Sequence, residues 1–274
     1  MKYAWYSMIA LVLAFGAGFF LAALVRRKLK KKPPLWVHIL SGTGIGILIC
    51  VAAAFGYLSV HYSAKEEALQ VLSESSGVKI SPMDGGYLLD GPGEKAALIF
   101  YPGTKVEAEA YLPLMKRTAE KGVDCFLLKM PMNMPFFGKN AADRVTAAYD
   151  YETLLIGGHS LGGYVAAGYA AEHEDRIDGV VLLAAYPPAQ LGDSLRLLSV
   201  YGSEDGELGM ESYESAKRYY PKDSTEVIIQ GGNHAQFGNY GSMKNDGEAT
   251  ITAREQQEQT ADAIVQIAQG LLRK

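Results

Sequence analysis

Three residues that can carry out nucleophilic catalysis follow short apolar runs, in the order serine, aspartate, histidine. Ser160 lies in the motif GHSLGG, Asp205 in GSEDG and His234 in GGNH. In such a triad the serine hydroxyl attacks a carbonyl carbon and the histidine accepts the hydroxyl proton. The aspartate fixes the imidazole tautomer and stabilises its positive charge. The pattern therefore predicts acyl chemistry that proceeds through an acyl-enzyme on Ser160.

The surroundings of Ser160 are those of a nucleophile elbow. An apolar run ends at Ile156 and a helix-like segment begins at Leu161, which is a strand–turn–helix context. Glycines flank the serine because a strained turn needs neighbours without a Cβ atom. A serine at such a turn can also be an ordinary helix N-cap, and the short motif alone is a weak signal. The aspartate and histidine that follow in order favour the catalytic interpretation.

The acid and the base of the triad each have competitors in the sequence. Glu204 and Glu207 lie close to Asp205, and any of these carboxylates can be a solvated turn residue. Asp205 is favoured because it comes just past the end of a predicted strand, where a triad acid is expected, and His234 is favoured on the same ground. The other histidines lie in an apolar segment, at a helix end or beside the nucleophile: His38, His61, His173 and His159.

A backbone oxyanion hole is expected where a predicted strand, 96–101, runs into the sequence YPGTK. The turn there can present an N–H group to the oxygen that becomes negative in the transition state. Thr104 is the first choice for this donor and Gly103 is the alternative. The second donor is the N–H of Leu161, the residue after the nucleophile. Losing one such donor typically costs about 3–4 kcal/mol.

An apolar segment, MPMNMPFFG at residues 130–138, follows a predicted strand at the same edge as the triad. Its thioethers and aromatic rings allow three interpretations: an acyl- or ring-binding pocket, a loop that dips into a membrane surface, or ordinary packing beneath a loop. The substrate-pocket candidates in this segment are Met132, Met134, Phe136 and Phe137.

The elements that must position these residues alternate between strand and helix. This alternation predicts an α/β fold with a mainly parallel, doubly wound sheet. The carboxyl ends of such strands meet at one edge, so the three side chains can converge there. Strands are expected at 78–81, 87–90, 96–101, 124–130, 153–156, 179–184, 197–201 and 226–229, and helices at 107–120, 141–149, 161–173, 210–219 and 252–272.

Two long uncharged segments near the start of the sequence predict a transmembrane hairpin. Residues 3–25 and 35–62 are each long enough to cross a hydrocarbon layer of about 30 Å as a helix, and glycines at 16, 18, 42 and 46 would allow close packing. The loop 26–34 carries six Lys or Arg residues and is expected to stay cytoplasmic, which places the catalytic domain outside. A cleaved signal peptide would have an apolar stretch of only about 7–15 residues.

The remaining chain is expected to form a tether or short helix at 63–77 and a catalytic domain at 78–274. The 274 residues are 49% hydrophobic with two cysteines, which excludes a disordered chain and a disulfide-stapled miniprotein. Residues 35–274 carry 19 basic and 30 acidic side chains, an unfavourable balance for binding nucleic acid. Neither a metal-binding nor a nucleotide-binding motif is found in the sequence, so no metal or cofactor is expected.

From residue 78 to residue 272 the chain resembles the α/β-hydrolase superfamily, in particular its compact dienelactone-hydrolase-like branch. The resemblance implies that Ser160, Asp205 and His234 are the triad and that Leu161 supplies an oxyanion donor. Many relatives have His-Gly in the oxyanion loop, where this chain has Pro-Gly, and segment 184–195 is too short for the helical cap that many insert. The motifs that carry the resemblance are FYPG (100–103), GHSLGG (158–163), GSEDG (202–206) and GNHAQFG (232–238).

The chain thus looks like a membrane-anchored bacterial serine hydrolase of carboxylic esters, with two spans in the plasma membrane and an extracytoplasmic catalytic domain. Its expected partners are the lipid bilayer and a small-molecule or lipid-like ester, while the sequence does not indicate the oligomeric state. Acyl transfer or amide cleavage would use the same triad. A non-catalytic envelope scaffold on the same fold is a further alternative, which the intact apparent triad disfavours.

Overall fold

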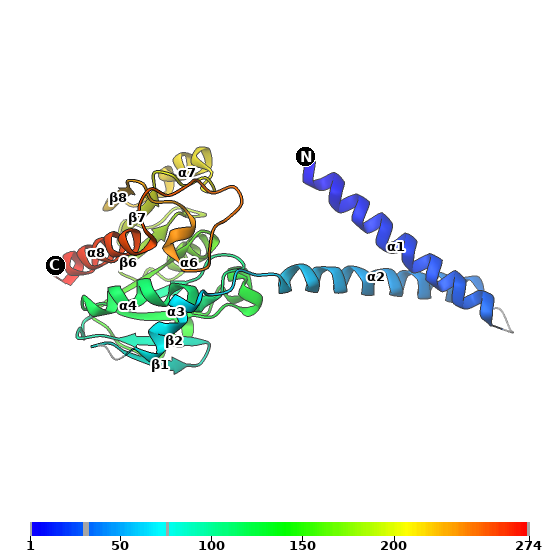
Figure 1. The fold of residues 1–274 in the computed structure, drawn as a ribbon, viewed down its shortest axis with the longest axis horizontal. Helices are drawn as coiled ribbons and strands as arrows, with labels where there is room; N and C mark the ends of the chain where they lie inside the picture. Colours follow the sequence, from blue (N-terminus) through cyan, green and yellow to red (C-terminus); the bar gives the residue numbers. More distant parts are fainter. Residues whose placement is uncertain (1, 30–32, 75–76, 273–274) are drawn as a thin grey trace. The chain divides into compact units, whose positions relative to one another are not determined.

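The computed structural model describes residues 2–29, 33–74 and 77–272. The chain forms two compact units, Met1–Val60 and His61–Lys274. The first unit consists of helices and the second contains a sheet with helices on both of its faces (Figure 1).

The first unit is a pair of packed apolar helices, α1 (Lys2–Lys28) and α2 (Leu35–Ser59). By length and composition the segments Ala10–Lys28 and Leu35–Ser59 are apolar enough to cross a membrane. The helices approach closely at Gly18, where an added Cβ would lie 2.5 Å from the Gly42 carbonyl oxygen. Any larger residue at position 18 would therefore separate the two backbones.

The second unit is built on an eight-stranded sheet with the order β1-β2-β4-β3-β5-β6-β7-β8. Strands β1 and β2 are antiparallel to their neighbours, and all pairs from β4 to β8 are parallel. The parallel strands end at one edge, which we call the carboxyl edge. The strands are β1 (Lys79–Met83), β2 (Gly86–Asp90), β3 (Ala96–Tyr101), β4 (Asp124–Leu128), β5 (Thr153–His159), β6 (Gly179–Leu183), β7 (Arg196–Gly202) and β8 (Ser224–Ile229).

The central strands are buried on both faces because their apolar residues point alternately to two core layers. Leu98 and Phe100 of β3 pack in the layer under α4 and α8, which lie side by side. Ile99 and Tyr101 pack in the layer under α6. The helices are α3 (Glu66–Gln70), α4 (Leu112–Glu120), α5 (Asp143–Thr146), α6 (Leu161–Glu172), α7 (Met210–Ala216) and α8 (Ala253–Leu272). Short 3-10 helices are η1 (Val71–Ser73), η2 (Ala108–Tyr111), η3 (Pro131–Asn133), η4 (Pro135–Gly138), η5 (Lys217–Tyr219) and η6 (Ala235–Phe237).

The predicted α/β architecture is confirmed, because all eight expected strands are present in a mainly parallel sheet. Residues 184–195 are all described and contain no helix, so no cap is inserted there, as expected. The predicted helix 107–120 begins instead as the 3-10 helix η2. The predicted helix 141–149 shortens to α5, and beyond it the rings of Tyr149 and Tyr151 pack against Phe126.

The start of the second unit differs from the expected tether. Helix α2 ends at Ser59, before the predicted boundary at 62, because the next residues pair with the segment 105–107. The N–H of Tyr62 donates to the carbonyl oxygen of Lys105 (2.7 Å), and the N–H of Glu107 donates to that of Tyr62 (3.0 Å). Within the segment assigned to the tether, Ala68 and Val71 are buried in the core. Residues 61–73 therefore pack as part of the second unit.

Candidate active site

Ser160 stands on a sharp turn at the carboxyl edge, between the end of β5 and the start of α6. Its backbone has φ 54° and ψ −128°, a conformation that residues other than glycine rarely adopt. The Ser160 N–H donates to the Leu183 carbonyl oxygen of β6 (2.9 Å), which holds the turn in place. Such strain costs about 1–3 kcal/mol and persists where the surrounding structure enforces it. The serine is half-buried, so its hydroxyl stays within reach of a ligand.

The glycines of the motif are required by close backbone approaches. A Cβ on Gly158 would lie 2.4 Å from the Tyr101 carbonyl oxygen, and a Cβ on Gly162 would lie 2.2 Å from the Pro102 carbonyl oxygen. A Cβ on Gly163 would lie 2.6 Å from the carbonyl oxygen of Gly158. These contacts bring the loop after β3 against the first turn of α6, so the expected oxyanion loop and the nucleophile lie together.

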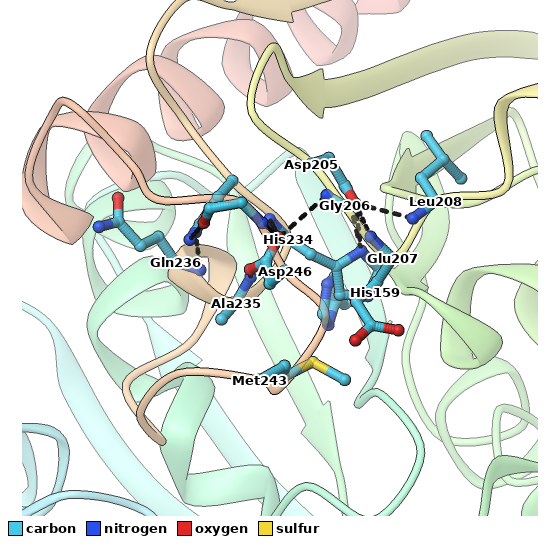
Figure 2. A network of polar contacts seen from close by, with 12 residues as sticks. His159, Asp205, Gly206, Glu207, Leu208, His234, Ala235, Gln236, Met243 and Asp246 are labelled. Carbon is cyan, nitrogen blue, oxygen red and sulfur yellow. Dashed lines mark hydrogen bonds and ion pairs between the residues drawn. The ribbon is translucent and has the colours of Figure 1, made fainter.

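Asp205 and His234 form a buried acid–imidazole pair at the same edge. Asp205 follows β7 and His234 follows β8. The Nδ1 atom of His234 lies 2.9 Å from Oδ2 and 3.1 Å from Oδ1 of the carboxylate, and the side chains are only 4% and 1% exposed. Figure 2 shows the imidazole facing this carboxylate. The pair has the geometry in which a carboxylate orients an imidazole and stabilises its charged form.

The neighbouring carboxylates do not contact the imidazole. Glu204 is exposed and accepts a hydrogen bond from the Ser203 hydroxyl (2.9 Å). Glu207 accepts one from the Asn245 N–H (3.3 Å). The Asp205 carboxylate is further fixed by the N–H groups of residues 207 and 208, at 2.9 and 2.7 Å from Oδ1. The contacts therefore select Asp205 among the three acidic residues.

A second carboxylate, that of Asp246, connects the loops that carry this pair. It accepts hydrogen bonds from the backbone N–H of His234 (3.1 Å), of Ala235 (2.8 Å) and of Gly206 (3.1 Å). Gly206 is the residue after Asp205, so one side chain ties both loops together (Figure 2). The sequence analysis missed Asp246, because it lies in a polar segment that resembles any surface turn.

His159, the residue before the nucleophile, lies behind the pair. The ring centres of His159 and His234 are 4.5 Å apart. The Tyr111 hydroxyl accepts the Gly103 N–H (3.1 Å), which leaves its proton for Nδ1 of His159 (2.8 Å). This assigns the proton of a neutral His159 to Nε2, which is buried and has no partner among the described residues. Burial, and secondarily the nearby His234, hold the pKa of His159 well below its ordinary value.

The expected oxyanion donors differ in their availability. The N–H of Gly103 is used by Tyr111 and is therefore engaged. In the described part of the chain, the N–H groups of Thr104 and Leu161 have no hydrogen-bond partner. Among the described residues, the Ser160 hydroxyl makes no hydrogen bond to His234. Catalytic hydrogen bonds often form fully only when substrate is bound.

The apolar candidates of the segment 130–138 do not form an enclosed pocket. Met132, Phe136 and Phe137 are exposed, and Met134 is half-buried. Phe137 lines an open cleft of ≈ 490 Å³, and Phe136 lines a smaller one of ≈ 130 Å³ together with Tyr164 of α6. Tyr164 also lines a cleft of ≈ 320 Å³ with Tyr186, Tyr219 and polar residues of α7. The sequence analysis did not single out these tyrosines, because no motif of the sequence includes them.

Clusters of metal-binding side chains and cysteine thiols are the other groups in the chain that could carry out chemistry. The residues that the structure describes hold no group of three or more His, Cys, Asp or Glu side chains able to bind a metal ion. Cys125 is fully buried in β4, and burial raises the pKa of its thiol.

A family model described as the alpha/beta hydrolase family matches residues 97–258. The matched segment includes Ser160, Asp205 and His234. None of the curated proteins is similar enough in sequence to match the chain.

Solved structures of hydrolases share the fold at low sequence identity. Est1E from Butyrivibrio proteoclasticus is 18% identical, with a TM-score of 0.51 over 73% of this chain and 100% of that protein. A soluble variant of monoglyceride lipase from Saccharomyces cerevisiae is 11% identical, with a TM-score of 0.52 over 73% and 96%. An S-formylglutathione hydrolase from Agrobacterium tumefaciens is 12% identical, with a TM-score of 0.51 over 72% and 98%. These similarities confirm the predicted fold.

Proposed function

The chain belongs to the alpha/beta hydrolase family, since the family model matches more than half of it, and from this premise we propose that it is a membrane-anchored serine hydrolase that cleaves carboxylic esters. The observation that carries the proposal is the buried Asp205–His234 pair at the carboxyl edge, together with the strained elbow at Ser160. Strain of this kind is characteristic of functional sites. Both observations favour an enzyme over a non-catalytic scaffold.

In the proposed reaction, the Ser160 hydroxyl oxygen attacks the ester carbonyl carbon while Nε2 of His234 accepts the hydroxyl proton. The carbonyl oxygen becomes negative and is stabilised by the N–H groups of Thr104 and Leu161. The tetrahedral intermediate collapses, the bond to the alcohol oxygen breaks, and His234 gives its proton to the departing alcohol. Asp205 stabilises the imidazolium that exists between these transfers.

The acyl-enzyme on Ser160 is then resolved by water through the same steps. His234 removes a proton from water, the hydroxide adds to the acyl carbon, and the oxyanion again faces the two backbone donors. Collapse breaks the bond to the Ser160 oxygen, which takes the proton back from His234. The products are an alcohol and a carboxylic acid, and the enzyme returns to its starting state.

The proposed substrates are small-molecule or lipid-like esters. No cap is inserted between β6 and β7, so the carboxyl edge is open to substrates of varied shape. Est1E has been solved with ferulic acid bound, and the yeast monoglyceride lipase with a substrate analogue. By analogy, the ≈ 320 Å³ cleft lined by Tyr164 and Tyr186 would hold the acyl or alcohol part of an ester.

The proposed anchor is the pair of apolar helices α1 and α2. The basic loop between them favours a cytoplasmic position for the loop and an extracytoplasmic one for the catalytic domain, as in a dienelactone-hydrolase-like bacterial enzyme of the plasma membrane. Protease treatment of intact cells should therefore digest the second unit. Protection until the cells are broken would contradict this orientation.

The test of the proposed activity uses the full chain in detergent micelles with a panel of p-nitrophenyl esters. Replacing Ser160→Ala should lower kcat by about 10³-fold or more while the protein stays folded. The matched control is Ser73→Ala, because Ser73 is exposed and, among the described residues, its hydroxyl hydrogen-bonds to the Gln70 carbonyl oxygen alone. Full ester hydrolysis by the Ser160→Ala variant would contradict the proposal.

A further inference from the structure

An exposed apolar tip lies at the carboxyl edge, in the segment that follows β4. It consists of Met132, Phe136 and Phe137, which are 38%, 54% and 56% exposed. The backbone that carries it is unusual, because Met132 and Asn133 both have φ 53°. Large apolar groups exposed together at one place mark an interaction site more often than ordinary surface.

The apolar tip is connected to the point where the chain enters the second unit. The Lys105 N–H donates to the Asn133 carbonyl oxygen (2.7 Å), and the Lys105 carbonyl oxygen accepts from the Tyr62 N–H (2.7 Å). In sequence, only two residues separate Tyr62 from the end of α2 at Ser59. A helix apolar enough to span a membrane therefore leads directly into the surface that carries the tip.

Basic side chains accompany the tip. Lys139 follows it directly and is exposed, and Arg144 lines the ≈ 490 Å³ cleft together with Phe137. Lys129 lines the same cleft but is paired with Glu109 at 2.5 Å. The described residues that line this cleft include no acidic side chain. In a bilayer surface, acyl chains lie beneath anionic headgroups. The apolar rings of the tip would contact the acyl chains, and the basic side chains beside them would contact the headgroups.

We propose that the apolar tip inserts into the surface of an anionic phospholipid bilayer and that Ser160 acts on a lipid-like ester held in that bilayer. The substrate part rests on the proposed function, whereas insertion of the tip does not require catalysis. A bilayer is favoured over a protein partner because the chain continues from this surface into α2 and because basic residues border the tip. With the tip in the headgroup layer, the open carboxyl edge faces membrane-held esters.

The first test places a fluorophore on the tip of the full chain. Phe137→Cys, in a Cys50→Ala background, is labelled with an environment-sensitive dye, and Cys125 stays unlabelled because it is buried. The matched control is Tyr149→Cys, since Tyr149 is an aromatic residue of similar kind, 38% exposed, that precedes β5 and so lies at the opposite edge. Both proteins are reconstituted into phosphatidylcholine–phosphatidylglycerol nanodiscs with and without doxyl-labelled lipid.

Doxyl lipid should quench the dye at position 137 at least twofold more than the dye at position 149, with a shift of its emission to shorter wavelength. Equal quenching at both positions would overturn the insertion of the tip. Because quenching does not depend on turnover, a protein that is quenched at 137 but hydrolyses no ester would refute the proposed function and leave the insertion standing.

The second test separates membrane presentation from pocket binding. In the Phe136→Ser, Phe137→Ser variant, the ratio of the rate on a vesicle-borne lipid ester to the rate on a soluble ester should fall about tenfold. Near-UV circular dichroism confirms that the variant is folded. A pocket role would lower both rates together and leave the ratio unchanged, which would overturn the substrate part of the proposal.

Discussion

Two regions at the same edge of the sheet are built in opposite ways. The loops that carry Asp205 and His234 are fixed by several hydrogen bonds to the carboxylates of Asp205 and Asp246. The side chains of the Asp205–His234 pair are almost completely shielded from solvent. The apolar tip, in contrast, exposes more than half of Phe136 and Phe137 and is held mainly through backbone hydrogen bonds such as Lys105 to Asn133. The first region fixes the positions of the Asp205 and His234 side chains, and the second leaves an apolar surface exposed.

The difference shows how a single sheet edge can serve two needs. Proton transfer requires groups held within a fraction of an ångström, so polar partners must be buried and fully bonded. Contact with an extended partner requires apolar area that remains exposed until the partner arrives. Variants in the first region should therefore change chemistry, whereas variants in the second should change neither chemistry nor folding strongly in the absence of that partner.

The largest effect is expected when the acid of the pair is altered. Asp205→Asn keeps the shape but stabilises the wrong imidazole tautomer, and kcat should fall about 10⁴-fold with an unchanged melting temperature. Ester hydrolysis and thermal unfolding of the full chain measure the two quantities. Glu204→Gln is the matched control and should retain activity, because Glu204 does not contact His234. Loss of activity in Glu204→Gln, with activity retained in Asp205→Asn, would show that Glu204 is the acid.

A smaller effect is expected from Asp246→Asn. An amide can accept hydrogen bonds through only one oxygen, so some of the N–H groups of the two loops lose their partner. A resulting displacement of His234 should lower kcat by about 10²-fold, with a smaller change in KM. The control is Asp193→Asn, which alters an exposed ion pair with Lys222 and a hydrogen bond from the Lys222 N–H. A variant that alters KM alone would contradict the positioning role of Asp246.

The pH dependence of stability should report the buried imidazole of His159. Its pKa is held below the ordinary value by burial, so below pH about 6.5 the unfolded chain binds a proton that the folded protein does not. Stability should therefore decrease as the pH falls from about 6.5 toward the folded pKa, by up to about 1.4 kcal/mol per pH unit.

The variant that tests this dependence is His159→Gln, measured by thermal unfolding between pH 7.5 and 5.5. The slope of melting temperature against pH should flatten in His159→Gln, whatever its absolute stability. His173→Gln, at the end of α6, is the comparison, because His173 is a histidine that is only half-buried. An unchanged slope in His159→Gln would contradict a buried, neutral His159.

The smallest effect is expected at the apolar tip. Phe137→Ser should change the free energy of unfolding by no more than about 0.5 kcal/mol in detergent, because the ring is largely exposed. Phe126→Ala, at a fully buried position, should cost about 3–5 kcal/mol. Denaturant titrations compare the two. A large loss at position 137 would mean that the ring supports the core rather than an external contact.

The fold and the candidate triad were accessible from sequence for physical reasons. Runs such as 96–101 and 179–183 are continuously apolar, as strands buried on both faces must be, and they appear as β3 and β6. Ser160, Asp205 and His234 each follow such a run, and parallel strands bring their carboxyl ends together. Their predicted roles remain proposals that the variants above address.

Other features depend on contacts that no local pattern encodes. Asp246 bonds to residues 40 and 12 positions away, and its own polar segment has no periodicity. Tyr111 occupies an apolar position of a helical segment, yet its hydroxyl accepts a hydrogen bond from the Gly103 N–H. Gly103 was the alternative oxyanion donor in the sequence analysis. In the segment expected to be a tether, the buried residues among those described are Ala68 and Val71, and the acidic residues around them conceal the signal.

The most direct test of the central claim is fluorophosphonate labelling of the full chain in detergent. The account predicts rapid labelling that disappears in Ser160→Ala and falls steeply in His234→Ala, while Ser73→Ala labels like the wild type. A folded wild-type protein that takes no label, or labelling that persists in Ser160→Ala, would contradict an activated serine at this elbow.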